Sequence, residues 1–391
     1  MGSKGIADRV AIVGMGCTSF GEHWDKGAAD LLVEAATEAY QSAGVDQDQV
    51  DAYWLGTMGS GYSGLMLSEA LKTPYKPVTR LENMCATGSE AIRNAAYAVA
   101  SGAYDLAMAI GVEKLKDSGF SGLVVSRPPD DGTATSMTAP AMFALLAPAY
   151  AKKYGVDDDV LKEVLTRIAW KNHRNGAKNP KAQFRKEIPM EKIAASPAVA
   201  GMLGIFDCSG VSDGSAAAIL CRAEDAHKYT DSPIFIKALS VVAGPSEGYL
   251  SQDYDFTTFQ EVVVSAKDAY EQAGITNPRE EISMAEVHDC FTPTELVLME
   301  DMGFSPRGQA WKDVLDGRFD GDGAQPVNPD GGLKSFGHPI GASGLRMMFE
   351  MWLQLRGEAG ERQISDPKLG LTHNLGGAPG RCVSFVSVVG K

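Results

Sequence analysis

Short apolar runs alternate with amphipathic runs along the first third of the chain. Residues 10–16 are apolar and end in glycines, which is typical of a buried strand. Residues 28–43 then carry apolar side chains at helical spacing and stop at Gly44. Further strands are predicted at 50–55 and 106–111, with a glycine-rich loop at 56–64 and an alanine-rich helix at 91–100 between them. This alternation predicts an α/β fold, in which helices cover a sheet.

The pattern changes between about residues 116 and 203. A segment rich in Pro, Asp and Ser at 127–138 precedes two helical patterns, at 142–154 and 157–172. Small and apolar residues return at 210–220, as a strand of the first region would have them. We therefore expect a mainly helical insertion in the first α/β unit.

The second half of the chain repeats the first. Residues 36–45 resemble residues 266–275, and an apolar strand follows each segment. The helix after Cys85 has a counterpart that starts near His338 and runs to Leu355, followed by strands at 369–372 and 382–389. Duplicated halves place equivalent helix starts near a pseudo-twofold axis, so we expect Cys85 and His338 to face each other.

Cys85 lies in the segment Asn-Met-Cys-Ala-Thr-Gly-Ser-Glu, just before the predicted alanine-rich helix. A cysteine at the first turn of a helix faces unpaired N–H groups and the positive end of the helix dipole, which favours the thiolate. Gly88 and Ser89 leave room for a substrate carbonyl. An isolated cysteine is more often a small buried apolar residue, but the duplication favours a nucleophile here.

Two histidines and a second cysteine complete the candidate chemistry. His338 lies in a glycine-rich loop, where it can accept a thiol proton or donate to an oxyanion. His288 and Cys290 occupy alternate positions, hence one face of a strand or of its extension. Two thiols and two imidazoles suit acyl transfer through a thioester. Their spacing is not that of a zinc finger, and no metal is expected in this chain.

Two further segments are candidates for binding. Residues 373–380 read as a polar, glycine-rich turn whose N–H groups could form an oxyanion hole, or as an ordinary connection between strands. A basic cluster suits a phosphorylated cofactor, although a solvated cationic helix face is an equal alternative. Its members are Arg167, Lys171, His173, Arg174, Lys178, Lys181, Arg185 and Lys186.

Charge and cysteine content narrow the class of protein. The formal net charge is -14 and the sequence pI is about 4.9, which argues against nucleic acid or an anionic membrane as a partner. The six cysteines are scattered, as expected of reduced thiols. No apolar run reaches membrane-spanning length, and no targeting segment is recognised, so we expect a cytoplasmic protein.

Together these segments resemble the thiolase superfamily over essentially the whole chain. The Cys85 segment, the run Cys-Ser-Gly-Val-Ser-Asp-Gly at 208–214 and the Gly-His-Pro loop around His338 occur in thiolase order. The resemblance implies a duplicated five-layered αβαβα thiolase fold and a dimer. It divides the chain into an N-terminal half (1–116 and 204–230), a loop domain that covers coenzyme A (117–203) and a C-terminal half (231–391).

The resemblance also indicates a subtype. Where ordinary thiolases carry an Asn-Glu motif, this chain has His-Asp-Cys-Phe at 288–291, and Asn-Leu-Gly at 374–376 replaces their Cys-x-Gly motif. The cysteine that moves the proton in ordinary thiolases is therefore absent from its usual site, and the resemblance implies that Cys290 takes this role. This exchange is typical of the sterol-carrier-protein-2-like thiolases. Cys382, on the strand beyond the glycine turn, is read as structural.

Roles carried over from the family are implied by the resemblance alone. Cys85 would be acylated, His338 would activate it, and Cys290 would move the α-proton. His288 and His338 would hold one thioester oxygen, while the N–H groups of Cys85 and Gly376 would hold the other oxyanion. Arg167, Lys171, His173 and Arg174 would contact the phosphates of coenzyme A.

The implied reaction is reversible cleavage of a 3-oxoacyl-CoA by CoA. Members of the subtype often act with a small partner that has an OB-fold and a zinc ribbon, so we expect such a partner.

Within the subtype the chain is most similar to the bacterial degradative branch, which includes the large subunit of benzoylsuccinyl-CoA thiolase. A short-chain acetoacetyl-CoA thiolase is the alternative, and a non-catalytic acyl-CoA-binding scaffold is a third. A ketoacyl synthase would leave Cys290 without a role, and a hydroxymethylglutaryl-CoA synthase would need a glutamate as its acid and base.

Overall fold

The computed structural model describes residues 5–117, 138–246, 248 and 251–391. The strands are β1 (Val10–Cys17), β2 (Ala52–Gly56), β3 (Val78–Leu81), β4 (Leu106–Glu113), β5 (Ala198–Ala200), β6 (Leu203–Gly204), β7 (Gly214–Arg222), β8 (Ile234–Ala243), β9 (Met284–Glu286), β10 (Leu369–Ala378) and β11 (Arg381–Gly390). The helices are α1 (Ala28–Ala43), α2 (Leu65–Leu71), α3 (Thr87–Ala100), α4 (Ala139–Phe143), α5 (Leu146–Tyr154), α6 (Asp158–Ala177), α7 (Met190–Ala194), α8 (Gln260–Ala273), α9 (Pro278–Glu281), α10 (Thr292–Asp301), α11 (Ala310–Leu315), α12 (Gly332–Ser335) and α13 (Ser343–Arg356). In these ranges no helix combines the length and apolar character needed to span a bilayer.

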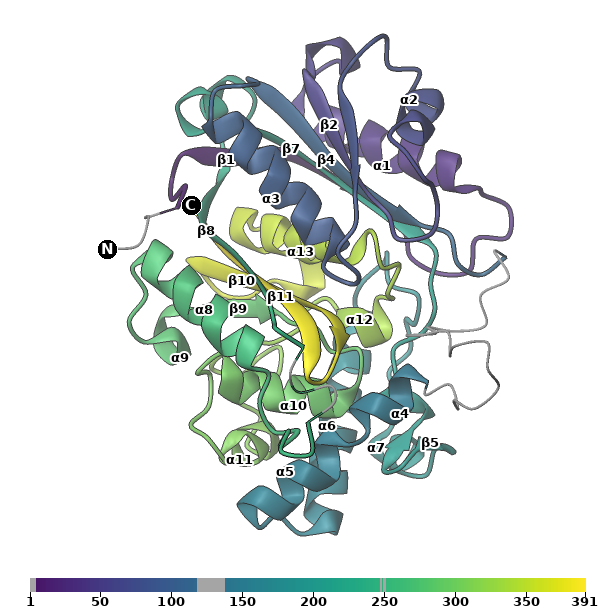
Figure 1. Ribbon diagram of the computed structural model, residues 1–391, viewed down its shortest axis with the longest axis vertical. Helices are drawn as coiled ribbons and strands as arrows, with labels where there is room; N and C mark the ends of the chain where they lie inside the picture. Colours follow the sequence, from purple (N-terminus) through teal and green to yellow (C-terminus); the bar gives the residue numbers. More distant parts are fainter. Residues whose placement is uncertain (1–4, 118–137, 247, 249–250) are drawn as a thin grey trace.

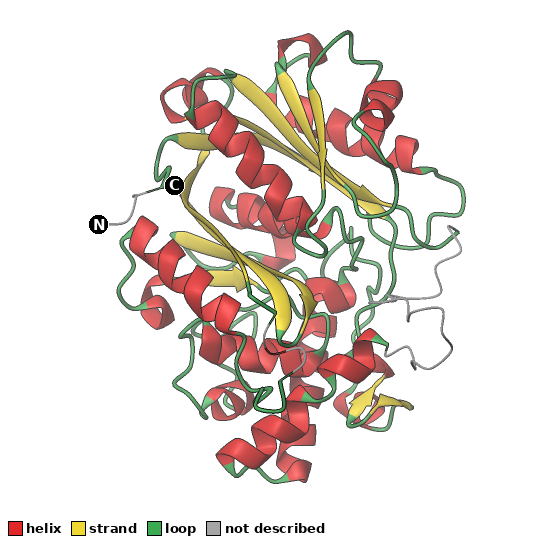
Figure 2. Ribbon diagram, viewed as in Figure 1, coloured by secondary structure: helices red, strands yellow, loops and turns green. Residues whose placement is uncertain are grey.

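The two halves share one mixed sheet with the strand order β3-β2-β4-β7-β1-β8-β11-β10-β9. Strand β2 runs parallel to β3 and β4, and β10 runs parallel to β9, whereas the other neighbours are antiparallel. The halves meet at a short contact between β1 and β8, where Ala11 pairs with Phe235 and Ile12 with Ile234. Each half therefore supplies one part of this sheet, its half-sheet, and Figure 2 shows the two half-sheets as two yellow layers.

Helices and half-sheets stack in five layers. Helix α1 covers the outer face of the N-terminal half-sheet and α8 covers that of the C-terminal half-sheet, while α3 and α13 pack against each other between them (Figure 1). The duplicated αβαβα fold is thus confirmed. Equivalent helices also end alike, because α1 stops at Gly44 (φ 64°) and α8 at Gly274 (φ 72°), in the left-handed conformation that glycine adopts at low cost.

The insertion between β4 and β7 is mainly helical, as predicted. Its helix α6 packs against α10, α11 and α12 of the C-terminal half. The predicted helix at 142–154 is two helices, α4 and α5, with α4 beginning at Ala139. The predicted Pro-, Asp- and Ser-rich segment at 127–138 lies outside the described residues except for its last position.

Two sequence-based boundaries were wrong in ways that affect the site. Residues 373–378 are not a turn, because β10 continues to Ala378 in register with β11 and only Pro379 and Gly380 connect the two strands. The counterpart of α3 does not begin at His338, because α13 starts at Ser343. His338 therefore lies in the loop between α12 and α13. The cause is local, since glycines and Pro339 interrupt the helical hydrogen bonding before Ser343.

Candidate active site

A sharp turn before α3 presents Cys85. Met84 has φ 50°, which is unfavourable for a residue with a side chain and costs about 1–3 kcal/mol. Thr87 stabilises the turn, because its hydroxyl donates to the Met84 carbonyl (2.5 Å) and accepts from the Asn83 N–H (2.9 Å). Cys85 itself lies two residues before the first residue of α3, not within its first turn.

The thiol of Cys85 is neutral in the free site. Desolvation by the surrounding protein, with smaller effects from Glu82 and Glu113, raises the pKa of the Cys85 thiol to about 12. The expectation that the helix end alone would favour the thiolate is therefore corrected. Burial outweighs the dipole at this position, so a base must remove the proton as the sulfur reacts.

His338 is oriented to be that base. Ser343 donates its hydroxyl proton to the Pro339 carbonyl (2.9 Å), so the 2.7 Å contact between Ser343 Oγ and His338 Nδ1 requires the imidazole to donate. This assigns the Nδ1–H tautomer and leaves a lone pair on Nε2, which is buried and has no hydrogen-bond partner among the described residues. Desolvation, and then the charge of Arg346, lowers the pKa of His338 to about 3, so the ring is neutral.

His288 and Cys290 lie in the segment between β9 and α10, beyond the end of the strand. Both are buried. Burial lowers the pKa of His288 well below its usual value and raises the pKa of the Cys290 thiol well above its usual value, and Cys85 adds to the second effect. The Cys290 sulfur lies 3.8 Å from Thr294 Oγ1, at the start of α10. Cys290 is thus a protonated thiol close to Cys85.

The structure brings the predicted catalytic groups from both halves together. The Cys85 sulfur and one ring nitrogen each of His288 and His338 lie within 4.8 Å of one another. The two imidazole rings are edge to face, with centroids 5.3 Å apart. A nucleophile, a base and a second imidazole therefore share one space. Sulfur and nitrogen donors so arranged could also take a soft metal ion such as Zn²⁺.

The end of β10 forms the wall beside Cys85. A side chain at Gly376 would come within 2.8 Å of the Asn83 carbonyl, so only glycine allows this close packing. The backbone N–H groups of Cys85 and of Gly377, the residue after Gly376, lower the pKa of the Cys85 thiol, an effect smaller than that of its desolvation. A cavity of about 290 Å³ adjoins the turn and is lined by Asn83, Met84, Ala243, Gly244, Ser246, Gly376, Gly377, Ala378, Arg381, Cys382 and Val383.

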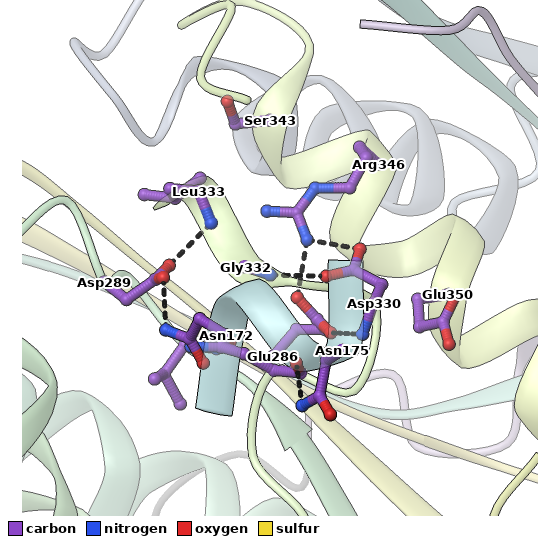
Figure 3. Close-up of polar contacts among 12 residues, drawn as sticks. Asn172, Asn175, Glu286, Asp289, Asp330, Gly332, Leu333, Ser343, Arg346 and Glu350 are labelled. Carbon is purple, nitrogen blue, oxygen red and sulfur yellow. Dashed lines mark hydrogen bonds and ion pairs between the residues drawn. The ribbon is translucent and has the colours of Figure 1, made fainter. Parts of the chain in front are cut away.

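A buried ionic cluster supports the loop that carries His338. The Arg346 guanidinium, on α13, contacts Glu286 and Asp330 at 2.5 Å each, and all three side chains are fully buried (Figure 3). Asp330 also accepts from the Gly332 N–H at 2.8 Å. A buried cation that is paired in this way is expensive to disrupt. It also fixes α13, and with it Ser343, relative to β9.

Two of the four residues predicted to contact CoA phosphates are engaged elsewhere. Lys171 is buried and donates to Glu295 and to the Val327 carbonyl, both at 2.7 Å. His173 is buried beside Phe206, and desolvation lowers its pKa to about 3. Neither offers a free positive charge, so the geometry does not support a phosphate contact for Lys171 or His173. The sequence predicts that Lys171 and His173 belong to a charged face of a helix, whereas in the structure both side chains are packed in the interior.

The other basic residues lie nearer to solvent. Arg167 pairs with Asp320 at 2.5 Å, and Arg174, about a third exposed, is 3.7 Å from Asp322. Lys178, Arg185 and Lys186 are exposed and line a surface depression of about 650 Å³, together with Ala177, Asn179, Pro180, Gln183 and Glu361. The accessible positive charge is therefore concentrated after the end of α6.

Sequence reasoning missed several polar residues of the site. Ser343 sets the tautomer of His338, Glu113 accepts from the loop at Gly341, and Asp289 accepts from Leu333. Ser343 follows His338 by five residues in the same glycine-rich run, so its proximity could have been inferred from the sequence. Glu113 could not, because its partners come from distant segments.

Comparison with known proteins agrees with this geometry. The family described as Thiolase, N-terminal domain matches residues 10–224, and the family described as Thiolase C-terminal domain-like matches residues 244–387. A solved structure of the Ltp2-ChsH2(DUF35) aldolase has the same fold, with a TM-score of 0.82 and 24% identity over 99% of this chain and 98% of that one.

Curated relatives cover nearly the whole chain. An acetyl-CoA acetyltransferase of Methanothermobacter thermautotrophicus is 38% identical over 95% of this chain and 97% of its own. Human sterol carrier protein 2 is 33% identical over 94% of this chain and 70% of its own. The benzoylsuccinyl-CoA thiolase subunit BbsB of Thauera aromatica is 31% identical over 94% and 95%. With two thiols and two imidazoles on a duplicated αβαβα scaffold, the chain belongs to the thiolase family of acyltransferases.

Proposed function

We propose that the chain cleaves a 3-oxoacyl-CoA with CoA, through an acyl group carried on Cys85. This proposal rests on the position of the Cys85 sulfur. The sulfur lies within 4.8 Å of a ring nitrogen of His288 and of a ring nitrogen of His338, and these histidines come from two separate segments of the C-terminal half. A neutral thiol beside a neutral imidazole suits proton transfer coupled to nucleophilic attack.

The first half-reaction forms the thioester. His338 Nε2 takes the Cys85 proton as the sulfur attacks the 3-oxo carbon, and the bond between C2 and C3 breaks. The electron pair moves to C2 of the departing acyl-CoA enolate, which takes the proton of the Cys290 thiol. His288 and protonated His338 stabilise the enolate oxygen, while the N–H groups of Cys85 and Gly376 stabilise the tetrahedral oxyanion. The N–H of Gly377, which lowers the pKa of the Cys85 thiol, is a further candidate donor at that place.

The second half-reaction restores the enzyme. The Cys290 thiolate takes the proton of incoming CoA, whose sulfur attacks the Cys85 thioester. Cys85 leaves as a thiolate and recovers its proton from His338. High pKa values for both thiols suit this scheme, because each sulfur holds its proton until a partner requires it.

For the substrate, we propose a short-chain 3-oxoacyl-CoA such as acetoacetyl-CoA. Two relatives named acetyl-CoA acetyltransferase, at 38% and 37% identity, support this choice. The likeness to BbsB at 31% identity supports a second candidate, an aromatic 3-oxoacyl-CoA such as benzoylsuccinyl-CoA. A thiolysis assay with both esters separates them, because only the true acyl group should give saturable turnover at low substrate concentration.

For CoA itself, we propose that the phosphates lie near the depression lined by Lys178, Arg185 and Lys186. Of the two predicted residues that remain, Arg174 is the proposed further contact, because Arg167 pairs closely with Asp320. Residues 117–203 would then be the domain that covers CoA. A change of Arg185 and Lys186 to Gln together should raise the KM for CoA and leave kcat nearly unchanged. A KM equal to that of the wild type would contradict the placement.

We further propose a homodimer, a small OB-fold and zinc-ribbon partner, and a cytoplasmic location. The structural neighbour, the Ltp2-ChsH2(DUF35) aldolase, is named for two components, and this supports the proposal of a partner. Copurification from a source that holds both genes, followed by sedimentation of the complex, tests both assembly proposals. A monomer that reaches full activity alone would refute them.

A further inference from the structure

Helix α12 and the loop that follows it, which carries His338, form one segment that is held at both ends by buried carboxylates. At its start, Asp289 Oδ1 accepts from the Leu333 N–H at 2.6 Å and Oδ2 accepts from the Lys334 N–H at 3.3 Å. Asn172 Nδ2, from α6, donates to the same carboxylate at 2.8 Å (Figure 3). Asp289 lies between His288 and Cys290 in the sequence, so one side chain links both catalytic segments of the C-terminal half.

The fit at this end is tight. Gly332 has φ 65°, and a side chain built there would come within 2.3 Å of Asp289 Oδ2. The Asp289 carboxylate is fully buried, so solvent cannot replace the N–H donors that it would lose. The position of the loop relative to Cys290 therefore depends on these hydrogen bonds.

At the other end, the anchor comes from the N-terminal half. Glu113, at the end of β4, accepts from the Gly341 N–H at 3.1 Å. The same carboxylate accepts from the Met58 and Gly59 N–H groups and from the Thr57 and Ser60 hydroxyls, at 2.7–3.0 Å. Glu113 is fully buried, and it ties the end of the His338 loop to the segment 57–60.

We propose that Asp289 and Glu113 are positioning residues that fix the His338 loop from its two ends, so that Nε2 of His338 is aimed at the Cys85 sulfur. The inference rests on the proposed role of His338 as base. His338 lies between the two anchors, and its backbone N–H donates to Ser212 Oγ at 3.1 Å. A displacement of this loop by about 1 Å would cost on the order of 100-fold in rate.

The test measures alkylation of Cys85 by iodoacetamide at fixed pH, together with kcat and KM for acetoacetyl-CoA thiolysis. Asp289→Asn keeps the shape of the side chain but turns one acceptor into a donor that faces other donors. We expect alkylation and kcat to fall on the order of 10- to 100-fold, with little change in KM. Asp301→Asn is the matched control, because Asp301 is also buried, accepts from the Phe259 N–H at 2.8 Å and pairs with Arg307, which lies outside the loop.

A double-mutant cycle separates positioning from general destabilisation. In a His338→Ala background, Asp289→Asn should cause no further loss of alkylation, because the base that it positions is gone. An equal loss in both backgrounds would overturn the inference. If His338→Ala slows alkylation but Asp289→Asn does not, the inference alone fails. If His338→Ala leaves alkylation unchanged, the proposal that His338 is the base is wrong, and so is the inference that Asp289 and Glu113 position it.

Glu113→Gln provides a second route if Asp289→Asn does not fold. Glu113 raises the pKa of the Cys85 thiol, so loss of its charge alone would speed alkylation. Slower alkylation in Glu113→Gln, with a thermal unfolding midpoint near that of the wild type, would therefore report a displaced His338. Faster or unchanged alkylation would overturn the role of Glu113 as an anchor.

Discussion

Cys85 and His338 are far apart in the sequence and belong to different halves of a duplicated fold, yet the Cys85 sulfur and a ring nitrogen of His338 lie within 4.8 Å of each other. Each residue lies just before a helix of the central layer, Cys85 before α3 and His338 before α13. Because α3 and α13 pack against each other, the sulfur and the imidazole meet at the interface between the halves. The approach of these two side chains thus follows from the duplication.

Cys290 should matter more for carbon–carbon bond chemistry than for acylation of Cys85. Cys290→Ala removes the thiol that moves the α-proton, so condensation of two acetyl-CoA molecules should fall roughly 100- to 10,000-fold. Transfer of an acetyl group from acetyl-CoA to Cys85 removes no α-proton and uses Cys290 only to protonate the departing CoA thiolate, so this step should fall much less than the condensation. Measurement of both steps in the same preparation tests the division of labour, with Cys221→Ala as a control for loss of a buried thiol. Equal loss of both steps would contradict it.

The neutral state of Cys85 predicts a particular pH dependence. With the pKa of the thiol near 12 and that of His338 near 3, the thiolate fraction in the free enzyme rises throughout the range from pH 6 to pH 10. In His338→Ala, where no base assists, the rate of alkylation by iodoacetamide should therefore increase across this range, up to about tenfold per unit, and the wild-type rate should exceed it most at low pH. A rate in His338→Ala that levels off below pH 7 would contradict the high pKa of the thiol.

The site should bind zinc as an inhibitor. Cys85, His288 and His338 offer one sulfur and two nitrogen donors within 4.8 Å of one another, and these are ligand types that zinc takes. Zn²⁺ should inhibit thiolysis, and EDTA should restore activity. Because the metal must displace the Cys85 proton, inhibition should strengthen as pH rises. His288→Ala should weaken zinc binding, measured by calorimetry, and unchanged binding in that variant would exclude the site.

Buried histidines should make the protein sensitive to acid. His373, on β10, is fully buried, and desolvation lowers its pKa to about 3, whereas the unfolded chain should titrate near 6.5. Between these values the unfolded state binds more protons than the native state, so stability is complete above about pH 6.5 and is lost as the pH falls toward 3.

His373→Gln tests this contribution. The wild type should lose up to about 1.4 kcal/mol of unfolding free energy per pH unit through His373 alone, and the variant should not. Urea unfolding at pH 7 and pH 5 measures the difference. Parallel loss in both proteins would show that His373 does not titrate as described.

Much of the architecture follows from local sequence patterns. Apolar periodicity and Gly44 define α1, and the repeated pattern before Gly274 defines α8. The duplication also predicts that Cys85 and His338 approach each other. These features are predictable because each depends on residues that are close in the sequence or on a repeat that can be read directly.

Features that depend on tertiary burial were not predictable in the same way. The sequence at Cys85 favours a thiolate, but desolvation by residues from other segments reverses the direction of its pKa shift. Lys171 reads as part of a basic face, yet it is buried against Glu295 from α10. Residues 373–378 have a turn-like composition, but pairing with β11 makes them a strand.

Capture of the acyl-enzyme tests the central claim most directly. Wild-type protein is mixed with acetoacetyl-CoA in the absence of free CoA, quenched in acid, and analysed by mass spectrometry of the intact chain and of its peptides. We expect an acetyl group on the peptide that contains Cys85, and none in Cys85→Ser. An acetyl group on Cys290 instead, or undiminished turnover by Cys85→Ser, would contradict the proposed role of Cys85.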